Sequence, residues 1–313
     1  MLELRKDYIL DRWVIAASKR GKRPKEYKQE NNTKEPKVCV FCPGNEDLTP
    51  PEIGRVEKNK KWILRWFPNK FPFVEEVGSP KITTKNKYFT KSSGFGKHEV
   101  ITDTNNHKLQ LWDTGKEHIK ILLDVLKERI IELEKVKNMK YVQIFKNHGE
   151  KAGTSIIHSH IQITALAIVP PSIREELRAI KKHKKCPYCG IIKLEQKSKR
   201  KCFENKTFLA FAPYASRFNY EVWVFPKKHI KTLNELTETE TKDLSEILNK
   251  ILKKLRELNL SYNLLLHYSP KKENLHMHIE ITPRIATWAG FEFSTGITIN
   301  SVMPKFAAEF YRS

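Results

Sequence analysis

An internal repeat constrains most strongly which folds this sequence can adopt, because one series of motifs occurs twice in the same order. The first series consists of CVFC (39–42), HEVITDTNNH (98–107), an amphipathic segment, YVQIFKN (141–147) and HSHIQIT (158–164). The second consists of CPYC (186–189), YEVWVFPKKHIKTL (220–233), another amphipathic segment, YNLLLHY (262–268) and HMHIEITP (276–283). Self-similarity of this kind predicts two halves built from the same elements.

The two amphipathic segments are predicted helices. Residues 113–136 carry apolar side chains at helical spacing. Residues 236–258 do the same, and Thr237 with Glu240 three residues later is a capping box. The segments around them are short and rich in β-branched and aromatic residues, which predicts strands. The sequence therefore predicts the α+β class, with an antiparallel sheet packed with helices in two pseudo-symmetric halves, residues 1–170 and 171–313.

The composition is that of a globular protein with a basic surface. Of the 313 residues 39% are hydrophobic, and 58 basic against 36 acidic residues give a net charge of +22. The lysines are scattered and no RNA-binding motif accompanies them, so nucleic acid is not expected as the main partner. No segment has the length of a membrane span and no secretory leader is visible, which favours a cytoplasmic protein.

Four of the five cysteines stand in two C-x-x-C pairs, and each pair is followed by histidines at matching places in the repeat. In a cytosolic chain this spacing indicates a metal rather than a disulfide, and two Cys and two His make a closed, structural zinc site. Cys202 is left as a small hydrophobic residue. The predicted ligands are Cys39, Cys42, His107 and His158 in the first half, and Cys186, Cys189, His229 and His276 in the second.

Each H-x-H motif places two histidines on one side of a strand, since alternate residues of a strand face the same way. If His158 binds the metal, His160 is left free beside it. A neutral imidazole is a competent nucleophile. The loop NHGEKAGTS (147–155) leads into this strand, and its backbone N–H groups and hydroxyls suit a phosphate.

At these motifs the chain resembles the galactose-1-phosphate uridylyltransferase family of the histidine-triad superfamily. The resemblance covers essentially the whole chain, and its further motifs are RWVIAASKRGKRP (12–24), FPNKFP (67–72), HEVI (98–101) and AGFEFSTGITIN (289–300). It implies two histidine-triad-like halves, with the nucleophile in residues 1–170. It also implies that His160 attacks the α-phosphorus of UDP-glucose, and that galactose 1-phosphate then accepts the uridylyl group in a ping-pong exchange. Gln162 would hydrogen-bond the phosphoryl group.

The resemblance extends to residues expected to contact the substrates, a nucleotide sugar and a sugar 1-phosphate, in a homodimeric enzyme. Surface charge or turn chemistry is the alternative explanation for the residues outside the H-x-H strand. Those matching the nucleotide and phosphate contacts are Arg20, Arg23, Asn69, Asn147, Gly153, Thr154 and Ser155. Those matching the sugar contacts are Phe291, where the family has a tyrosine, and Glu292.

One departure from the family pattern leaves the substrates open. Ser159 stands where well-known members have proline, and a serine at this position is found in relatives that resemble ADP-glucose phosphorylases. Adenylyl transfer from ADP-glucose to phosphate is therefore the second hypothesis for the reaction.

A zinc-dependent nucleic-acid-binding protein is the alternative of another class, and salt-sensitive oligonucleotide binding would support it.

The family's iron site offers a second assignment for the metal in the C-terminal half. Its ligands match Glu176, His267, His276 and His278. The zinc set is preferred because the repeat predicts it independently, and iron at the second site stays the alternative. Glu176 is then expected to be an early-helix acid.

Overall fold

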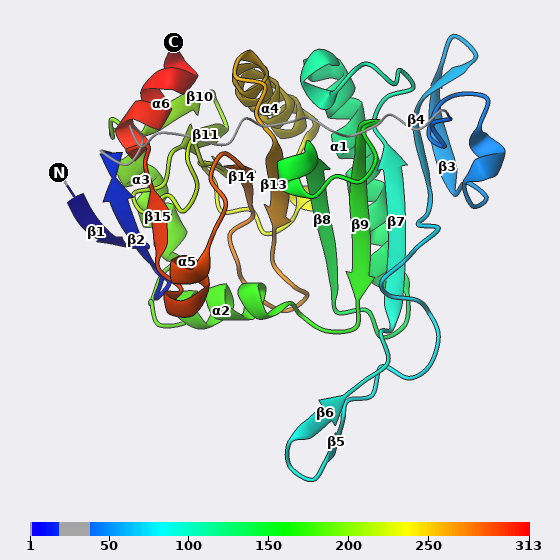
Figure 1. Cartoon of the computed structure of the whole chain (residues 1–313), viewed down its shortest axis with the longest axis horizontal. Helices are drawn as coiled ribbons and strands as arrows, with labels where there is room; N and C mark the ends of the chain where they lie inside the picture. Colours follow the sequence, from blue (N-terminus) through cyan, green and yellow to red (C-terminus); the bar gives the residue numbers. More distant parts are fainter. Residues whose placement is uncertain (1, 19–37) are drawn as a thin grey trace.

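The computed structural model describes residues 2–18 and 38–313, and its centre is one antiparallel ten-stranded sheet (Figure 1). The N-terminal half contributes β3 (Gly54–Lys58), β4 (Lys61–Pro68), β7 (Gly96–Thr102), β8 (Tyr141–His148) and β9 (His160–Leu166). The C-terminal half contributes β10 (Lys201–Glu204), β11 (Phe208–Phe211), β12 (Val222–Pro226), β13 (Tyr262–His267) and β14 (His278–Pro283).

The strand order of the sheet mirrors the sequence repeat. From edge to edge it runs β10-β11-β12-β14-β13-β8-β9-β7-β4-β3. Counted from either edge to the middle, the strands of one half correspond in order to those of the other half. The halves join where β8 and β13 pair, with Asn147 opposite Asn263 and Phe145 opposite Leu265. The predicted α+β class, the antiparallel sheet and the two similar halves are confirmed. The division at residue 170 stays a prediction.

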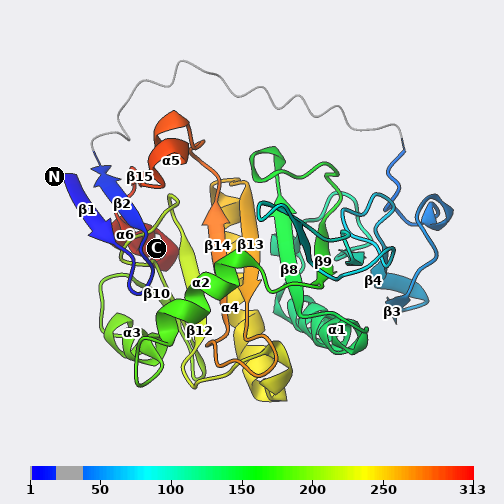
Figure 2. The ribbon, with the colours of Figure 1, turned by 90° about the horizontal axis from the view of Figure 1, so that it is seen from below.

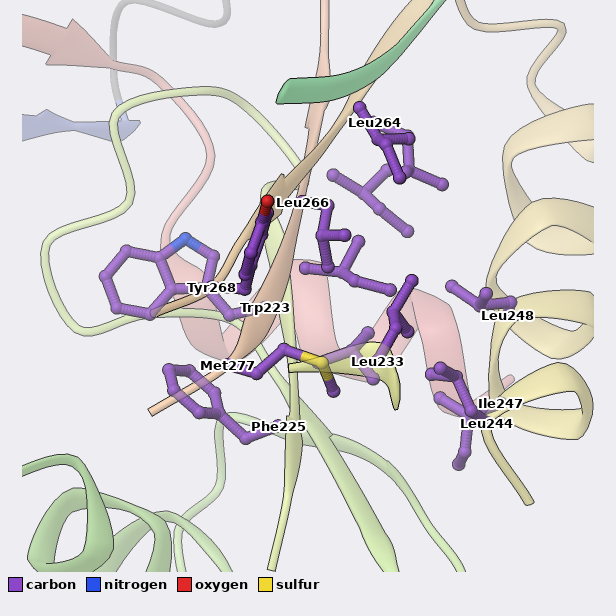
Figure 3. Packing of buried hydrophobic residues seen from close by; sticks show 14 of the residues in the cluster. Trp223, Phe225, Leu233, Leu244, Ile247, Leu248, Leu264, Leu266, Tyr268 and Met277 are labelled. Atoms are coloured by element: carbon purple, nitrogen blue, oxygen red, sulfur yellow. The ribbon is translucent and has the colours of Figure 1, made fainter. Parts of the chain in front are cut away.

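Two long helices, α1 (Lys116–Lys135) and α4 (Glu238–Glu257), pack side by side on one face of the sheet (Figure 1). The predicted capping box begins α4, since Thr237 Oγ1 accepts from the N–H of Glu240 and the Glu240 carboxylate accepts from the N–H of Thr237. Figure 3 shows the apolar side of α4 facing the sheet. Burial of such an apolar stripe is what holds an amphipathic helix to its sheet.

The segments outside the repeat form structure of their own. A small sheet combines β1 (Leu2–Lys6), β2 (Trp13–Ala17) and β15 (Thr298–Asn300), so a strand from the C-terminal part of the chain pairs with one from the N-terminal part. The remaining helices are α2 (Pro171–Ile180), α3 (Pro187–Glu195), α5 (Gly290–Thr295) and α6 (Pro304–Arg312), and a hairpin of β5 (Thr83–Lys85) and β6 (Phe89–Lys91) projects from the body (Figure 1). Among the described helices, none is long and apolar enough to cross a membrane.

A buried ion pair ties α1 to β7. The Arg129 guanidinium donates two hydrogen bonds to the Glu99 carboxylate, at 2.9 and 3.0 Å, and both residues are buried. This two-pronged geometry matches the fork of the guanidinium to both carboxylate oxygens. Glu99 lies next to β9 in the sheet, so the pair fixes the helix against the strands that carry the candidate site.

Removing the positive partner of this pair should destabilise the protein strongly. Arg129→Met leaves the Glu99 carboxylate buried and unpaired, which we expect to lower the free energy of unfolding by about 3–5 kcal/mol. Arg55→Met is the matched control, because Arg55 pairs with Glu52 at the surface and such a pair contributes about 1 kcal/mol or less. Urea unfolding of both variants gives the measurement, and equal losses would contradict this account.

Candidate active site and metal centres

The two histidines of the first H-x-H motif are held in opposite tautomers by backbone carbonyls. Nδ1 of His160 lies 2.8 Å from the carbonyl oxygen of His158, and Nε2 of His158 lies 2.8 Å from that of Thr104. A carbonyl oxygen only accepts, so each of these nitrogens carries a proton. The lone pair is therefore on Nε2 of His160 and on Nδ1 of His158. One motif thus presents one ring nitrogen suited to nucleophilic attack and one suited to binding a metal.

The environment of His160 keeps its imidazole neutral. The side chain is buried with 7% exposure, and its ring meets the edge of Phe41 at 5.4 Å between centroids. Burial, followed by the positive charge of Lys146, lowers the pKa of His160 to about 4. A neutral imidazole keeps the lone pair that nucleophilic attack needs.

Lys146 forms a buried polar network behind His160 that the sequence did not predict. Its ammonium lies 2.7 Å from Asp103 Oδ2, 2.8 Å from Ser159 Oγ and 3.0 Å from the carbonyl oxygen of His160. Lys146 is 1% exposed and Asp103 is fully buried. Ser159 therefore uses its hydroxyl to anchor the strand between the two histidines. In the sequence Lys146 was one of many lysines, and only the β8–β9 pairing places it here.

Both predicted zinc sets come together as compact clusters that could hold a metal ion. The ligand atoms of each set lie within 4.8 Å of one another. In the first set Nδ1 of His158 lies 3.5 and 3.6 Å from the sulfurs of Cys39 and Cys42. In the second, Nδ1 of His276 lies 3.6 Å from the Cys189 sulfur, and the corresponding Nε2 proton is donated to the carbonyl oxygen of Pro226 at 3.0 Å.

The donor chemistry of both clusters fits a tetrahedral cation. Zn–S and Zn–N bonds of about 2.3 and 2.0 Å at tetrahedral angles put sulfur and nitrogen about 3.5 Å apart. The sulfur–nitrogen distances in the two clusters are 3.5 to 3.9 Å. Burial and the neighbouring Cys39 thiol raise the pKa of Cys42 to about 11. Two thiolates side by side therefore need a cation to stabilise them. His229 shows the outer hydrogen bond typical of metal-binding histidines, from Nε2 to Asn274 Oδ1 at 3.0 Å.

Glu176 is not the early-helix acid that was expected, since the first turn of α2 contains no acidic residue. It lies in the middle of α2, is buried, and its Oε1 accepts from Nδ1 of His267 at 2.7 Å. With His278 the two residues form a third group of possible ligands, whereas His276 belongs to the cysteine cluster. The expectation was wrong because the helix turns this carboxylate inward onto β13. The two metal assignments therefore no longer compete for His276.

Asn69, His98 and Gln162 meet on the sheet beside His160. Gln162 follows His160 on the same face of β9 and lies opposite Val100 of β7. Nε2 of His98 lies 2.9 Å from Oε1 of Gln162 and 3.2 Å from Nδ2 of Asn69. The sequence placed Gln162 and Asn69 near the nucleotide but gave His98 no role. HEVI appeared among the motifs, which was the one available signal.

The loop that precedes β9 lines a cavity of about 620 Å³ together with His160. Asn147, Thr154 and Ser155 are among its lining residues. Gly153 ends the short helical turn Glu150–Ala152 in the left-handed region, with φ of 84°, which favours glycine. The Thr154 hydroxyl donates to the carbonyl oxygen of Asn147, which closes the loop on itself. The predicted phosphate loop is thus next to the predicted nucleophile.

The predicted sugar contacts are not brought to His160 within this chain. Phe291 and Glu292 lie on α5, which Figures 1 and 2 place beside the small sheet and away from β9. Glu292 caps its own helix by accepting from the N–H of Ala289 at 2.9 Å. Arg20 and Arg23 lie outside the described residues.

The second H-x-H motif repeats the geometry of the first but is covered by aromatic rings. Nδ1 of His278 donates to the carbonyl oxygen of His276 at 3.0 Å, as His160 does to His158. The Phe225 ring stacks on His278 at 4.6 Å and 14°, and Trp223 and Tyr188 lie near it as well. His278 is only 1% exposed. The repeat therefore presents one accessible and one enclosed histidine.

Comparison with known proteins gives the same relationship over the whole chain. The family model of the galactose-1-phosphate uridyl transferase N-terminal domain matches residues 2–170, and a domain of unknown function (DUF4921) matches residues 96–309. ADP-glucose phosphorylase from Arabidopsis thaliana is 34% identical, over 99% of this chain and 92% of its own. Galactose-1-phosphate uridylyltransferase from Thermotoga maritima is 29% identical, over 98% of this chain and 97% of its own.

Solved structures agree with these sequence matches. The crystal structure of the Arabidopsis thaliana ADP-glucose phosphorylase with bound ADP-glucose has a TM-score of 0.86 at 33% identity, covering 100% of this chain and 98% of that one. A structure of uridylyltransferase has a TM-score of 0.77 at 29% identity, covering 100% and 97%. Through the family match, these relatives and the H-x-H-x-Q site, this chain belongs to the galactose-1-phosphate uridylyltransferase family of nucleotidyltransferases.

Proposed function

We propose that this nucleotidyltransferase works by double displacement through Nε2 of His160. The observation that carries the proposal is the hydrogen bond from Nδ1 of His160 to the carbonyl oxygen of His158, which leaves the lone pair on Nε2. His278 has the same hydrogen bond but lies under Phe225, so it is not offered to a substrate.

The proposed reaction has two balanced steps. Nε2 attacks the α-phosphorus of a nucleotide sugar, an Nε2–P bond forms, and the P–O bond to the sugar 1-phosphate breaks. The nucleotidyl-imidazole then carries a positive charge, which makes it a good leaving group. A phosphate oxygen of the acceptor attacks the same phosphorus, and Nε2 leaves as a neutral imidazole. No proton has to be removed from Nδ1 in either step.

The residues around His160 have proposed roles in holding the substrate. Gln162 would donate to the phosphoryl group, and Asn69 would contact the nucleotide. The loop with Asn147, Gly153, Thr154 and Ser155 would bind phosphate through N–H groups and hydroxyls, as such loops do. Arg20 and Arg23 would neutralise phosphate charge.

We rank two pairs of substrates. The first is ADP-glucose as the donor with phosphate as the acceptor, and the second is UDP-glucose as the donor with galactose 1-phosphate as the acceptor. The identity of 34% and the TM-score of 0.86 with an ADP-glucose phosphorylase exceed the corresponding 29% and 0.77 with uridylyltransferases. The sequence had placed the uridine donor first, and the choice of base stays a prediction. Ser159 does not support either base directly, because its hydroxyl is used by Lys146.

We also propose zinc in both Cys2His2 clusters, a homodimer and a cytoplasmic location. Phe291 and Glu292 are far from His160 of their own chain, so a sugar-binding role for them requires a second copy. None of the five cysteines, all of them within the described residues, forms a disulfide, which suits a reducing compartment.

Incubation with a nucleotide sugar followed by intact mass measurement tests the proposed function. We expect the protein to gain the mass of an adenylyl group from ADP-glucose or a uridylyl group from UDP-glucose. His160→Ala should gain neither and lose exchange activity, because the nucleophile is gone. His278→Ala makes the same change in the enclosed motif and should still be labelled. Labelling of the His160→Ala protein would refute the assignment.

The pH dependence of labelling follows from the lowered pKa of His160. Its imidazole stays neutral down to a pKa of about 4. We expect the single-turnover rate to be constant from about pH 8 to about pH 6, and to fall only as the imidazole becomes protonated near its own pKa. Rapid-quench measurement across this range checks the prediction. Half of the rate lost near the ordinary histidine pKa of about 6.5 would contradict it.

Metal content distinguishes the assignments of the C-terminal cluster. We expect about two zinc ions per chain, one for each Cys2His2 set. Cys42→Ser and Cys189→Ser should each lose one ion, while Cys202→Ser, a buried cysteine outside both sets, should keep both. Elemental analysis of the purified proteins is the measurement. One zinc together with iron would instead favour the group of Glu176, His267 and His278.

A further inference from the structure

His98 has contacts that give it a place beside the proposed reaction. It lies on β7, is 5% exposed, and its ring packs on Phe73 at 4.3 Å between centroids. Its Nε2 faces two carboxamides, those of Gln162 and Asn69. Its Nδ1 is buried and has no hydrogen-bond partner among the described residues. The tautomer of this buried imidazole determines which of the two carboxamides it hydrogen-bonds.

The side-chain amide of Asn69 is already oriented by the backbone that follows it. Oδ1 of Asn69 accepts from the N–H of Phe71 at 2.9 Å, and the Asn69 N–H donates to the carbonyl oxygen of His98 at 2.8 Å. The NH2 group of Asn69 is thereby directed to His98. Nε2 of His98 cannot donate to an oxygen and accept from this NH2 group at the same time, because one ring nitrogen is a donor or an acceptor.

The shorter of the two distances favours the tautomer with the proton on Nε2. Oε1 of Gln162 lies 2.9 Å from Nε2, whereas Nδ2 of Asn69 lies 3.2 Å away. With the proton on Nε2, His98 donates to Oε1 and the Gln162 NH2 group turns away from it. With the proton on Nδ1, Nε2 would repel Oε1 and the carboxamide would turn round. Only the first arrangement gives a phosphoryl oxygen a donor, since that oxygen only accepts.

We propose that His98 is a positioning residue that orients the Gln162 carboxamide, so that its NH2 group faces the phosphoryl group carried by His160. The inference rests on the proposed function. A free carboxamide can offer either end to a ligand, and the oxygen end would repel a phosphoryl group. Donors fixed in advance toward developing charge contribute most to catalysis of this kind.

The enclosed half of the repeat supplies an internal comparison. Val100 of β7 lies opposite Gln162, and Trp223 of β12 lies opposite Glu280, so Glu280 takes the place of Gln162. His98 precedes Val100 by two residues, and Glu221 precedes Trp223 by two. The imidazole–amide pair is thus replaced by two carboxylates, and Glu280 pairs with Arg217 at 2.9 Å instead. Of the two halves, only the N-terminal half has a histidine and a glutamine at these equivalent positions.

Three substitutions of His98 separate positioning from packing. A glutamine side chain puts its amide nitrogen near the position of Nε2, an asparagine puts it near Nδ1, and a phenylalanine keeps only the ring. The rate measured is single-turnover labelling by the nucleotide sugar that labels the wild-type protein. The affinity for AMP or UMP and the melting temperature are measured beside it. His183→Asn, the same change at an exposed histidine, is the control.

We expect His98→Asn and His98→Phe to slow labelling by about 10-fold to 100-fold, less than removing an oxyanion donor outright. His98→Gln should recover most of the rate, with unchanged nucleotide affinity and melting temperature in all variants. In a Gln162→Ala background, His98→Asn should cost nothing more, because it acts through Gln162.

Several results would overturn the inference. These are an unchanged rate in His98→Asn, an equal loss in the Gln and Asn variants, or additive losses with Gln162→Ala. Wild-type protein that takes no label from either nucleotide sugar would refute the proposed function, and this inference with it. Labelled wild-type protein with an insensitive His98 would refute this inference alone.

Discussion

The hydrogen bond from Nδ1 of His160 to the carbonyl oxygen of His158 is the contact on which the rest of the site depends. It sets the tautomer of the proposed nucleophile, His160, and it joins His160 to a residue of the first Cys2His2 cluster. His158 is fixed in turn by the carbonyl oxygen of Thr104 and faces the two cysteines. A metal held there would position the nucleophile without touching the substrate, as a closed structural site can. Lys146 secures the same strand from behind.

The repeat shows how one scaffold can serve two purposes. Both halves have the H-x-H hydrogen bond and a Cys2His2 cluster, and they meet at the β8–β13 pairing. In the N-terminal half the second histidine, His160, lines a cavity. In the C-terminal half Phe225 covers His278, and Glu176 with His267 fills its polar side. We infer that the second half stabilises the sheet against which the first half works.

The parts of the fold and site that the sequence predicted are those with local or repeated signals. The two long helices follow from apolar spacing, and the Thr237 cap follows from a local motif. The two metal clusters follow from Cys and His at matching places in both halves. What the sequence did not predict depends on strand register. Lys146 reaches Ser159, and His98 reaches Gln162, only because β9 lies between β8 and β7 in one particular alignment.

The central claim is that the nucleotidyl group rests on His160 between two half-reactions, and isotope exchange tests it most directly. Labelled glucose 1-phosphate is mixed with unlabelled ADP-glucose or UDP-glucose and the protein, with no second acceptor present. A covalent intermediate requires the first step to run in both directions, so label should appear in the nucleotide sugar. No exchange until a second acceptor is added would mean direct transfer between substrates, and would contradict the account.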